Sequence, residues 1–387
     1  MTRTPTIARR TALLGAAGGA LALGAAACGS ADQEQPAAAA PGADGLTPVR
    51  LQLQWVTQGQ FAGYFAALDQ GYYADEGLDV QILEGGADIV PQTVLAQGQA
   101  DYAIAWVPKA LASREQGAMI TNVAQVFQRS GTLQVSFADA GIGDVAALRG
   151  RTVGNWGFGN EYELFAAMTA AGLDPSGDVT LVQQQFDMLG LLQGDIDAAQ
   201  AMTYNEYAQL LEAEDPATGE LYRPEDFTVL DWNEVGTAML QDAVWASSDR
   251  LADSAYQEQT VAFLKASLKG WAYARDEPEA ARDVVVARGS TLGASHQLWQ
   301  VNEVNKLVWP SPDGAGLVDP EAWERTVRIA LETRNAEGQT VITAEPDEEA
   351  WTDEYVREAL DALRAEGVDV TGESFSPLTV TLEPGGA

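Results

Sequence analysis

The sequence of 387 residues contains few of the residues that most often carry out catalysis. It has one histidine, His296, and one cysteine, Cys28. A Ser–His–Asp or Cys–His nucleophile system would have to use these two residues, and a histidine–cysteine metal site needs several such ligands. His296 lies in a stretch of helical periodicity, where we expect a structural role. We therefore predict no catalytic residue, no metal site and no cofactor. Catalysis by a pair of carboxylates is the one enzymatic alternative that stays open.

Basic residues are also scarce, because 22 Lys and Arg stand against 56 Asp and Glu and give a formal net charge of −34. Nucleic acids and anionic lipid surfaces attract proteins through basic patches, and this charge balance argues against both. We therefore predict that nucleic acid is not a partner, and that contact with a membrane requires a separate anchor.

Long apolar runs are absent from the body of the sequence, and the one that exists lies near the N-terminus. Arg3, Arg9 and Arg10 precede the uncharged run TALLGAAGGALALGAAA. A basic start, an apolar run and small residues before a cleavage point are typical of a signal peptide, which we predict over residues 1–27. The glycines within the run and the polar stretch after it disfavour a retained membrane span. The segment ARRTALL also resembles a twin-arginine signal, so export by the Sec or the Tat route stays open.

The lone cysteine ends this run. The sequence AAAC at Ala25–Cys28, followed by Gly29, resembles the lipobox of bacterial lipoproteins, although Ala25 stands where leucine is usual. Low-hydrophobicity residues rich in Ala, Pro and Gly follow, which indicates a flexible tether. We predict an acylated Cys28, a tether over residues 28–47, and a protein anchored on the outer face of the cell membrane.

From residue 48 the chain alternates between patterns typical of strands and of helices. Such alternation predicts an α/β fold with parallel strands and helices on the sheet faces. The strands are predicted over residues 51–55, 78–83, 101–106, 152–155, 179–183, 198–202 and 227–232, and one of the helices over residues 161–171.

Aromatic residues lie at or just beyond the carboxyl ends of five of these strands: Trp55, Trp106, Trp156, Tyr204 and Trp232. In open α/β sheets, ligands bind beyond the carboxyl ends of the strands. We therefore predict that these side chains converge on one cleft that binds a flat, π-rich ligand by stacking.

Polar side chains near the same strand ends would fix the orientation of such a ligand. Carboxylates and amides there favour amino groups or a cation. Lys109 is the main basic residue near these ends, so an anionic ligand is less favoured. The remaining residues predicted to contact the ligand are Gln58, Tyr64, Asn155, Phe158, Glu161, Asn205 and Glu206.

Several stretches resemble a known family. GQFAGYFAALDQGYYADEGLDVQI and AQGQADYAI are similar to the opening of solute-binding proteins that serve ABC importers, in the group for thiamine pyrimidine precursors and for nitrate, sulfonate and taurine. LRGRTVGNW resembles the family's entry to its second lobe, and AVWASSDRLAD its return to the first. The resemblance covers roughly residues 49–335. Fungal enzymes of this group use a histidine and a cysteine-rich motif that this chain lacks.

The resemblance implies a two-lobe type II periplasmic-binding-protein fold with two crossover hinge strands. Lobe one would comprise residues 48–140 and 240–387, and lobe two residues 141–239. It also implies a monomer that captures a flat nitrogen heterocycle, such as a thiamine pyrimidine precursor or a flavin-like ring, and delivers it to an ABC permease. A small anion such as a sulfonate, taurine or nitrate is the first alternative, and a carboxylate-based extracytoplasmic enzyme is the second.

Overall fold

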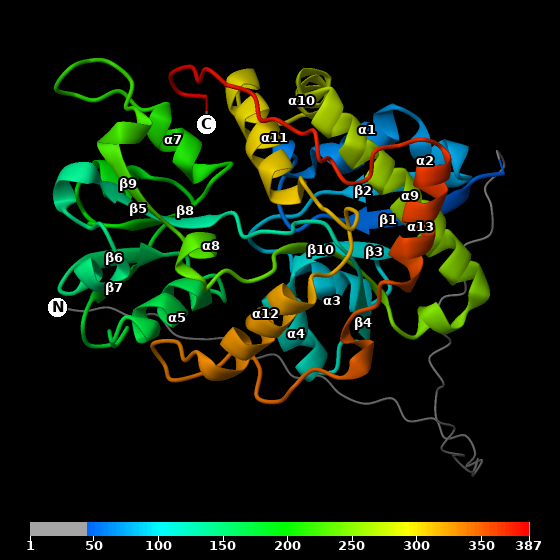
Figure 1. Cartoon of the computed structure of the whole chain (residues 1–387), viewed down its shortest axis with the longest axis horizontal. Coiled ribbons are helices and arrows are strands. Elements are labelled where there is room, and N and C mark those ends of the chain that lie inside the picture. Colours follow the sequence, from blue (N-terminus) through cyan, green and yellow to red (C-terminus); the bar gives the residue numbers. More distant parts are fainter. Residues whose placement is uncertain (1–44, 387) are drawn as a thin grey trace, which may run out of the picture. The chain divides into compact units, whose positions relative to one another are not determined.

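The computed structural model of the chain describes residues 45–386 (Figure 1). The predicted signal peptide, Cys28 and most of the predicted tether lie outside these residues. In the described part of the chain, no helix combines the length and the apolar character needed to cross a bilayer.

The first sheet has five strands in the order β2-β1-β3-β10-β4. Strands β1, β2 and β3 are parallel, whereas β10 is antiparallel to both β3 and β4. The chain therefore leaves this sheet after β4 and returns to its middle much later. The strand bounds are β1 Thr47–Gln52, β2 Leu78–Leu83, β3 Tyr102–Trp106, β4 Ile120–Gln125 and β10 Asp242–Ser247.

The strands of a second region form a three-stranded sheet of order β8-β5-β9 and a parallel pair, β6 and β7. Strand β5 is antiparallel to both of its neighbours. A parallel bridge between Val153 and Ala198 joins β6 to the start of β8. The strand bounds are β5 Thr132–Phe137, β6 Thr152–Asn155, β7 Thr180–Gln183, β8 Ala199–Met202 and β9 Phe227–Asp231.

Helices cover the faces of these sheets (Figure 1). Those of the first region are α1 Ala62–Asp69, α2 Tyr72–Asp75, α3 Pro91–Ala96, α4 Val107–Glu115, α9 Ser254–Asp276, α10 Pro278–Ala287, α11 Ala294–Val308, α12 Pro320–Glu332 and α13 Glu354–Ala365. Those of the second region are α5 Tyr162–Ala170, α6 Leu189–Leu192, α7 Glu206–Leu211 and α8 Trp232–Val235. Short 3₁₀ turns occupy Gly59–Phe61, Ala138–Ala140, Val145–Leu148, Pro224–Asp226, Arg250–Ala252 and Glu348–Ala350.

Alternate residues of the first sheet face opposite layers, because side chains along a strand alternate in direction. Ile104 and Val244 pack in a core with α1, α9, α11 and α13. Ala105 and Trp245 pack in a separate core with α3, α4 and α12. Since both faces are covered, the central strand β3 is buried and apolar throughout, as is typical of strands covered on both faces.

Two chain segments connect the regions, one between β4 and β5 and the other before β10. Gln241 joins them: its Oε1 accepts a hydrogen bond from the Gly131 N–H at 2.8 Å, and its Nε2 donates to Ser130 Oγ at 2.9 Å and to Thr132 Oγ1 at 2.7 Å. The two crossovers therefore lie side by side, which is the arrangement of a two-lobe protein with a paired hinge.

The lobe boundaries at residues 140 and 240 stay a prediction. Strand β5 falls within the range predicted for lobe one, yet it pairs only with β8 and β9 of the second region. On this pairing, we propose that lobe two begins near residue 131.

Most of the strand positions expected from the sequence agree with the structure. Strands β2 and β6 have the predicted bounds, and α5 is one residue shorter than predicted at each end. Strands β4, β5 and β10 were not predicted. All side chains of β4 are buried, including Thr121, Asn122 and Gln125, so this strand shows no alternation of polar and apolar residues.

Candidate ligand-binding site

A cavity of about 1050 Å³ lies at the carboxyl ends of strands from both regions. Trp55 follows β1 and Trp106 ends β3, while Trp156 follows β6 and Tyr204 follows β8. All but two of the residues predicted to contact a ligand line this cavity. They are Trp55, Gln58, Trp106, Asn155, Trp156, Phe158, Glu161, Tyr204, Asn205 and Glu206.

Tyr64 and Trp232 do not line the cavity, so their predicted position is corrected. Tyr64 is 1 % exposed and packs edge-on against Trp271, with ring centroids 5.5 Å apart. Trp232 is fully buried in the core of the second region with Phe165 and Leu230. It does follow β9 directly, but α8 begins at that residue and holds the indole within the core.

Rings from both regions form the apolar wall. Trp55 contacts Phe186 with centroids 4.9 Å apart, and Phe186 stacks on Trp156 at 6.0 Å with an interplanar angle of 27°. Trp156 is only 3 % exposed, so it belongs both to this wall and to the core, whereas Trp55 is half-buried. Phe186 therefore shows that a flat ring can contact aromatic residues of both regions at once.

The turn after β6 presents Phe158 to the cavity. Gly157, Phe158 and Gly159 all have positive φ, at 69°, 55° and 86°. For Phe158 this left-handed conformation costs about 1 kcal/mol or more, and its side chain is 80 % exposed. The Phe158 side chain therefore does not pack under the turn.

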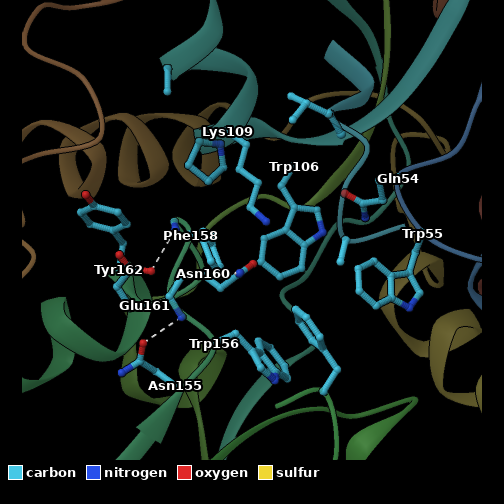
Figure 2. Close-up of a pocket in the computed structure, with 18 of the residues that line it drawn as sticks. Gln54, Trp55, Trp106, Lys109, Asn155, Trp156, Phe158, Asn160, Glu161 and Tyr162 are labelled. Atoms are coloured by element: carbon cyan, nitrogen blue, oxygen red, sulfur yellow. Dashed lines mark hydrogen bonds between the residues drawn. The ribbon is translucent and has the colours of Figure 1, made fainter. Parts of the chain in front are cut away.

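Side chains on either side of this turn hold it in place (Figure 2). Asn155 Oδ1 accepts from the Gly157 N–H at 2.9 Å, and Glu161 Oε2 accepts from the Gly159 N–H at 2.9 Å. Burial raises the pKa of the Glu161 carboxyl, while hydrogen bonds from backbone N–H groups, including that of Gly159, and the charge of Lys109 act in the opposite direction. The strained turn is thus fixed by the polar residues that also line the cavity.

A buried carboxylate, Asp242, lies behind the wall at the start of β10. Its Oδ1 accepts from Trp106 Nε1 at 2.9 Å and from Gln54 Nε2 at 2.5 Å, and its Oδ2 accepts from Gln60 Nε2 at 2.9 Å. Burial raises the pKa of Asp242 to about 7, although the three donors and Lys109 favour the ionised form. Asp242 orients three cavity-lining side chains without lining the cavity itself.

Lys109 extends from α4 beside the Trp106 indole (Figure 2), with its Nζ 4.9 Å from the ring centroid. Burial lowers the pKa of Lys109 to about 8, and the nearby acids Glu161 and Asp242 partly oppose this shift. The ammonium therefore carries most of its charge at pH 7, and one face of Trp106 is occupied by it.

The side chains of three of the predicted polar residues form hydrogen bonds with other groups of the protein. Gln58 donates to Gln60 Oε1 at 2.8 Å and accepts from Gln300, and Glu206 Oε2 accepts from the Met202 N–H at 2.9 Å. Asn205 Nδ2 donates to Glu206 Oε1 at 2.8 Å. Because these atoms already have partners in the protein, the three side chains contribute to the shape of the cavity more than to hydrogen bonding with a ligand.

The lone histidine lies behind Asn205. His296 is fully buried, with Nδ1 2.9 Å from Glu212 Oε2 and Nε2 3.0 Å from Asn205 Oδ1. It does not line the cavity, and it links α11 of the first region to the end of α7. This position agrees with the structural role expected for it.

The sequence argument missed several residues of the site. Gln54 and Phe186 follow β1 and β7, so the same rule about strand ends could have found them. Asp242 begins an antiparallel strand, and a rule about carboxyl ends overlooks it. The loop segment around Glu337 reaches the cavity from beyond α12, which no local pattern indicates. By contrast, the segment Lys306–Gly314 does not line the cavity, and Trp309 is buried beneath Arg275.

Comparison with known proteins gives relatives of two kinds. The profile of the family described as NMT1/THI5 like matches residues 58–281. The formylaminopyrimidine-binding protein of Halalkalibacterium halodurans is 26% identical over 73% of this chain and 84% of its own length. The riboflavin-binding protein RibY of Chloroflexus aurantiacus is 27% identical over 85% of this chain and 93% of its own. An enzyme also matches: 4-amino-5-hydroxymethyl-2-methylpyrimidine phosphate synthase of Schizosaccharomyces pombe is 25% identical, over 34% of this chain and 38% of its own.

Among solved structures, a sulfonate-binding protein, SsuA, from Methylobacillus flagellatus has a TM-score of 0.60 at 16% identity, over 87% of this chain and 99% of that one. At this identity the likeness concerns the fold alone. It confirms the predicted two-lobe fold of the periplasmic binding proteins.

Proposed function

This chain belongs to the NMT1/THI5-like family, and we propose that it is the extracytoplasmic solute-binding component of an ABC import system. Its ligand is a flat nitrogen heterocycle, of the pyrimidine-precursor or flavin-like type, captured between the two lobes and delivered to a permease. The protein acts as a monomer.

The observation that carries this proposal is the aromatic wall of the cavity. Trp55 and Trp156 come from different regions, and Phe186 contacts both rings. A flat heterocycle placed against this wall would gain about 0.5–1.5 kcal/mol beyond the area it buries for each ring on which it stacks. The relatives named for formylaminopyrimidine and riboflavin support the same class of ligand.

A small anion such as a sulfonate, taurine or nitrate is the second candidate, and Lys109 favours it. Four carboxyl groups of the lining oppose it, those of Asp88, Glu161, Glu206 and Glu337. A cavity of about 1050 Å³ also exceeds what so small a ligand fills. The heterocycle therefore suits this site better.

We propose binding without turnover, rather than catalysis by carboxylates on the same scaffold. His296 is held by Glu212 and Asn205 away from the cavity. Glu206 already accepts hydrogen bonds from Met202 and Asn205. Ligand recovered unchanged after prolonged incubation supports this part of the proposal, and a chemically altered ligand contradicts it.

Replacing Trp55 with alanine tests the stacking. We expect affinity for the heterocycle to fall about tenfold or more, which corresponds to about 1.4 kcal/mol. Because Trp55 is half-buried, the melting temperature should change little. The measurement is tryptophan-fluorescence titration with thiamine, its pyrimidine precursors, riboflavin, taurine and nitrate.

Trp351→Ala is the matched control, because Trp351 is also half-buried but packs on Trp323, away from the cavity. It should leave affinity unchanged. Tight taurine binding with no response to any heterocycle would overturn the proposed ligand class.

We also propose that the chain is exported and held on the outer face of the membrane by a lipid on Cys28. The basis is the AAAC–Gly sequence at the end of the apolar run. Replacing Cys28 with alanine should move the protein from the membrane fraction to the soluble exported fraction, because the acylated residue is lost. Fractionation of cells expressing each form measures this, with Ala26→Ser as a control that keeps the cysteine. A Cys28→Ala protein that stays in the membrane fraction argues against the anchor.

A further inference from the structure

Lys109 differs from the other lysines of this chain. The sequence has four lysines, all within the described residues, against 56 acids. Lys265, Lys269 and Lys306 each form an ion pair with a glutamate, at 2.6, 3.1 and 2.5 Å. In the described part of the chain, the Nζ of Lys109 has neither a hydrogen-bond acceptor nor a carboxylate within ion-pair distance, and its contact is the Trp106 ring.

An ammonium group in such a place lacks the hydrogen bonds that a buried charge requires. The Trp106 face compensates only part of the lost hydration. The Nζ lines the cavity, so its three N–H donors can bind a molecule that enters it. The complementary group on such a molecule is an oxygen with a full or partial negative charge.

Gln54 supplies the opposite kind of group beside the same indole. Its Nε2 donates to Asp242, which leaves its Oε1 as the unused end of the amide. Because the carboxylate of Asp242 is an acceptor, the Gln54 amide is held with its oxygen away from Asp242. Trp106 donates to the same Oδ1 atom of Asp242, so the two side chains are fixed relative to one another. Figure 2 shows Lys109 and Gln54 flanking the Trp106 indole.

We propose that Lys109 and Gln54 form hydrogen bonds with one edge of the ligand ring, and that this edge is a lactam or cyclic imide. The ammonium of Lys109 donates to a ring carbonyl oxygen, and Gln54 Oε1 accepts from the adjacent ring N–H. Trp55 and Phe186, the more exposed rings of the wall, contact the faces of the ring. This assignment rests on the proposed function and narrows it, because it favours a dione-bearing heterocycle over an aminopyrimidine without a carbonyl group.

The test compares two flat three-ring molecules, lumichrome and phenazine, of which only lumichrome carries the carbonyl–N–H edge. Binding to the full chain is measured by quenching of tryptophan fluorescence at pH 7. Wild-type protein should bind lumichrome at least tenfold more tightly than phenazine. Lys109→Met should remove most of that preference by weakening lumichrome alone, and Lys109→Arg should retain part of it.

Gln54→Leu lacks the acceptor, and it should lower lumichrome affinity while leaving phenazine affinity within about twofold. Thermal melting of each variant identifies loss of folding. Riboflavin, 4-amino-5-hydroxymethyl-2-methylpyrimidine and taurine complete the ligand set.

The outcomes separate the edge assignment from the proposed function. Equal binding of lumichrome by wild type and a folded Lys109→Met protein overturns the edge assignment and leaves a heterocycle-binding protein. Binding of the aminopyrimidine but not of lumichrome also overturns the edge assignment and leaves a heterocycle-binding protein. Binding of taurine alone, lost in Lys109→Met, overturns the proposed function and makes Lys109 an anion site.

Discussion

Replacing Trp232 with alanine is expected to lower the free energy of unfolding by about 3–5 kcal/mol, the range for truncating a large buried aromatic side chain. The indole is 0 % exposed and packs with Phe165, Leu230 and Ala238 in the core of the second region. Truncation would leave a void that the helices and strands around it can fill only in part. Urea unfolding followed by circular dichroism measures the loss.

The same substitution separates the two kinds of tryptophan that follow strands in this protein. Trp232→Ala should reduce stability with little effect on the affinity of the folded protein, whereas Trp55→Ala should do the reverse. Trp156→Ala should reduce both, because that residue is 3 % exposed and also lines the cavity. If Trp232→Ala weakens ligand binding as strongly as Trp55→Ala while stability is unchanged, our placement of Trp232 in the core is wrong.

Stability is expected to fall by several kcal/mol as the pH rises from about 4 to about 7, through two buried carboxyl groups. Burial raises the pKa of Asp242 to about 7 and that of Glu163 to about 7. Between their ordinary values and pH 7, these groups hold more protons in the folded state than in the unfolded state. The stability that these two groups contribute is therefore greatest below their pKa in the unfolded chain. It decreases as the pH rises to about 7 and is constant above that value.

Glu163→Gln gives the cleaner variant for this prediction. Glu163 Oε1 accepts from the Met239 N–H at 2.6 Å, and a glutamine keeps that acceptor without titrating. Asp242→Asn would instead place an N–H donor among the side chains that donate to Asp242. The measurement is the free energy of unfolding of wild type and Glu163→Gln at pH 4.5, 6 and 7.5.

The informative quantity is the difference in unfolding free energy between wild type and Glu163→Gln, because the large negative net charge of the protein also reduces stability as the pH rises. Glu163→Gln should have the shallower pH dependence and be relatively more stable at pH 7.5. Glu258→Gln, which removes one exposed charge on α9, is the control. Parallel curves for wild type and Glu163→Gln would show that burial does not perturb this group.

Both acids lie where the two regions join. Met239 belongs to the second crossover, and Asp242 begins β10 directly after it. Because Asp242 also holds Gln54, Gln60 and Trp106, the crossover and the cavity wall share one set of hydrogen bonds. Movement of the hinge would therefore change the orientation of the side chains that face a ligand.

The sequence by itself determined the α/β fold class, most of the strands and the aromatic residues at their ends. These features depend on neighbours only a few positions apart, such as the alternation around Leu78–Leu83 or the glycines on either side of Phe158. The rule that ligands bind beyond carboxyl ends then placed Trp55, Trp106 and Trp156 at one cavity.

Only the tertiary structure decided which strand-end residues face the cavity and which face the core. Tyr204 and Trp232 look equivalent in the sequence, yet one lines the cavity and the other is buried against α5. Trp106 and Asp242 are 136 residues apart, and only the antiparallel return of β10 brings them together. The orientation of Gln54 and the unpaired ammonium of Lys109 follow from that contact and from packing between regions. Local periodicity carries no information about such contacts, because they form only when distant segments share one sheet.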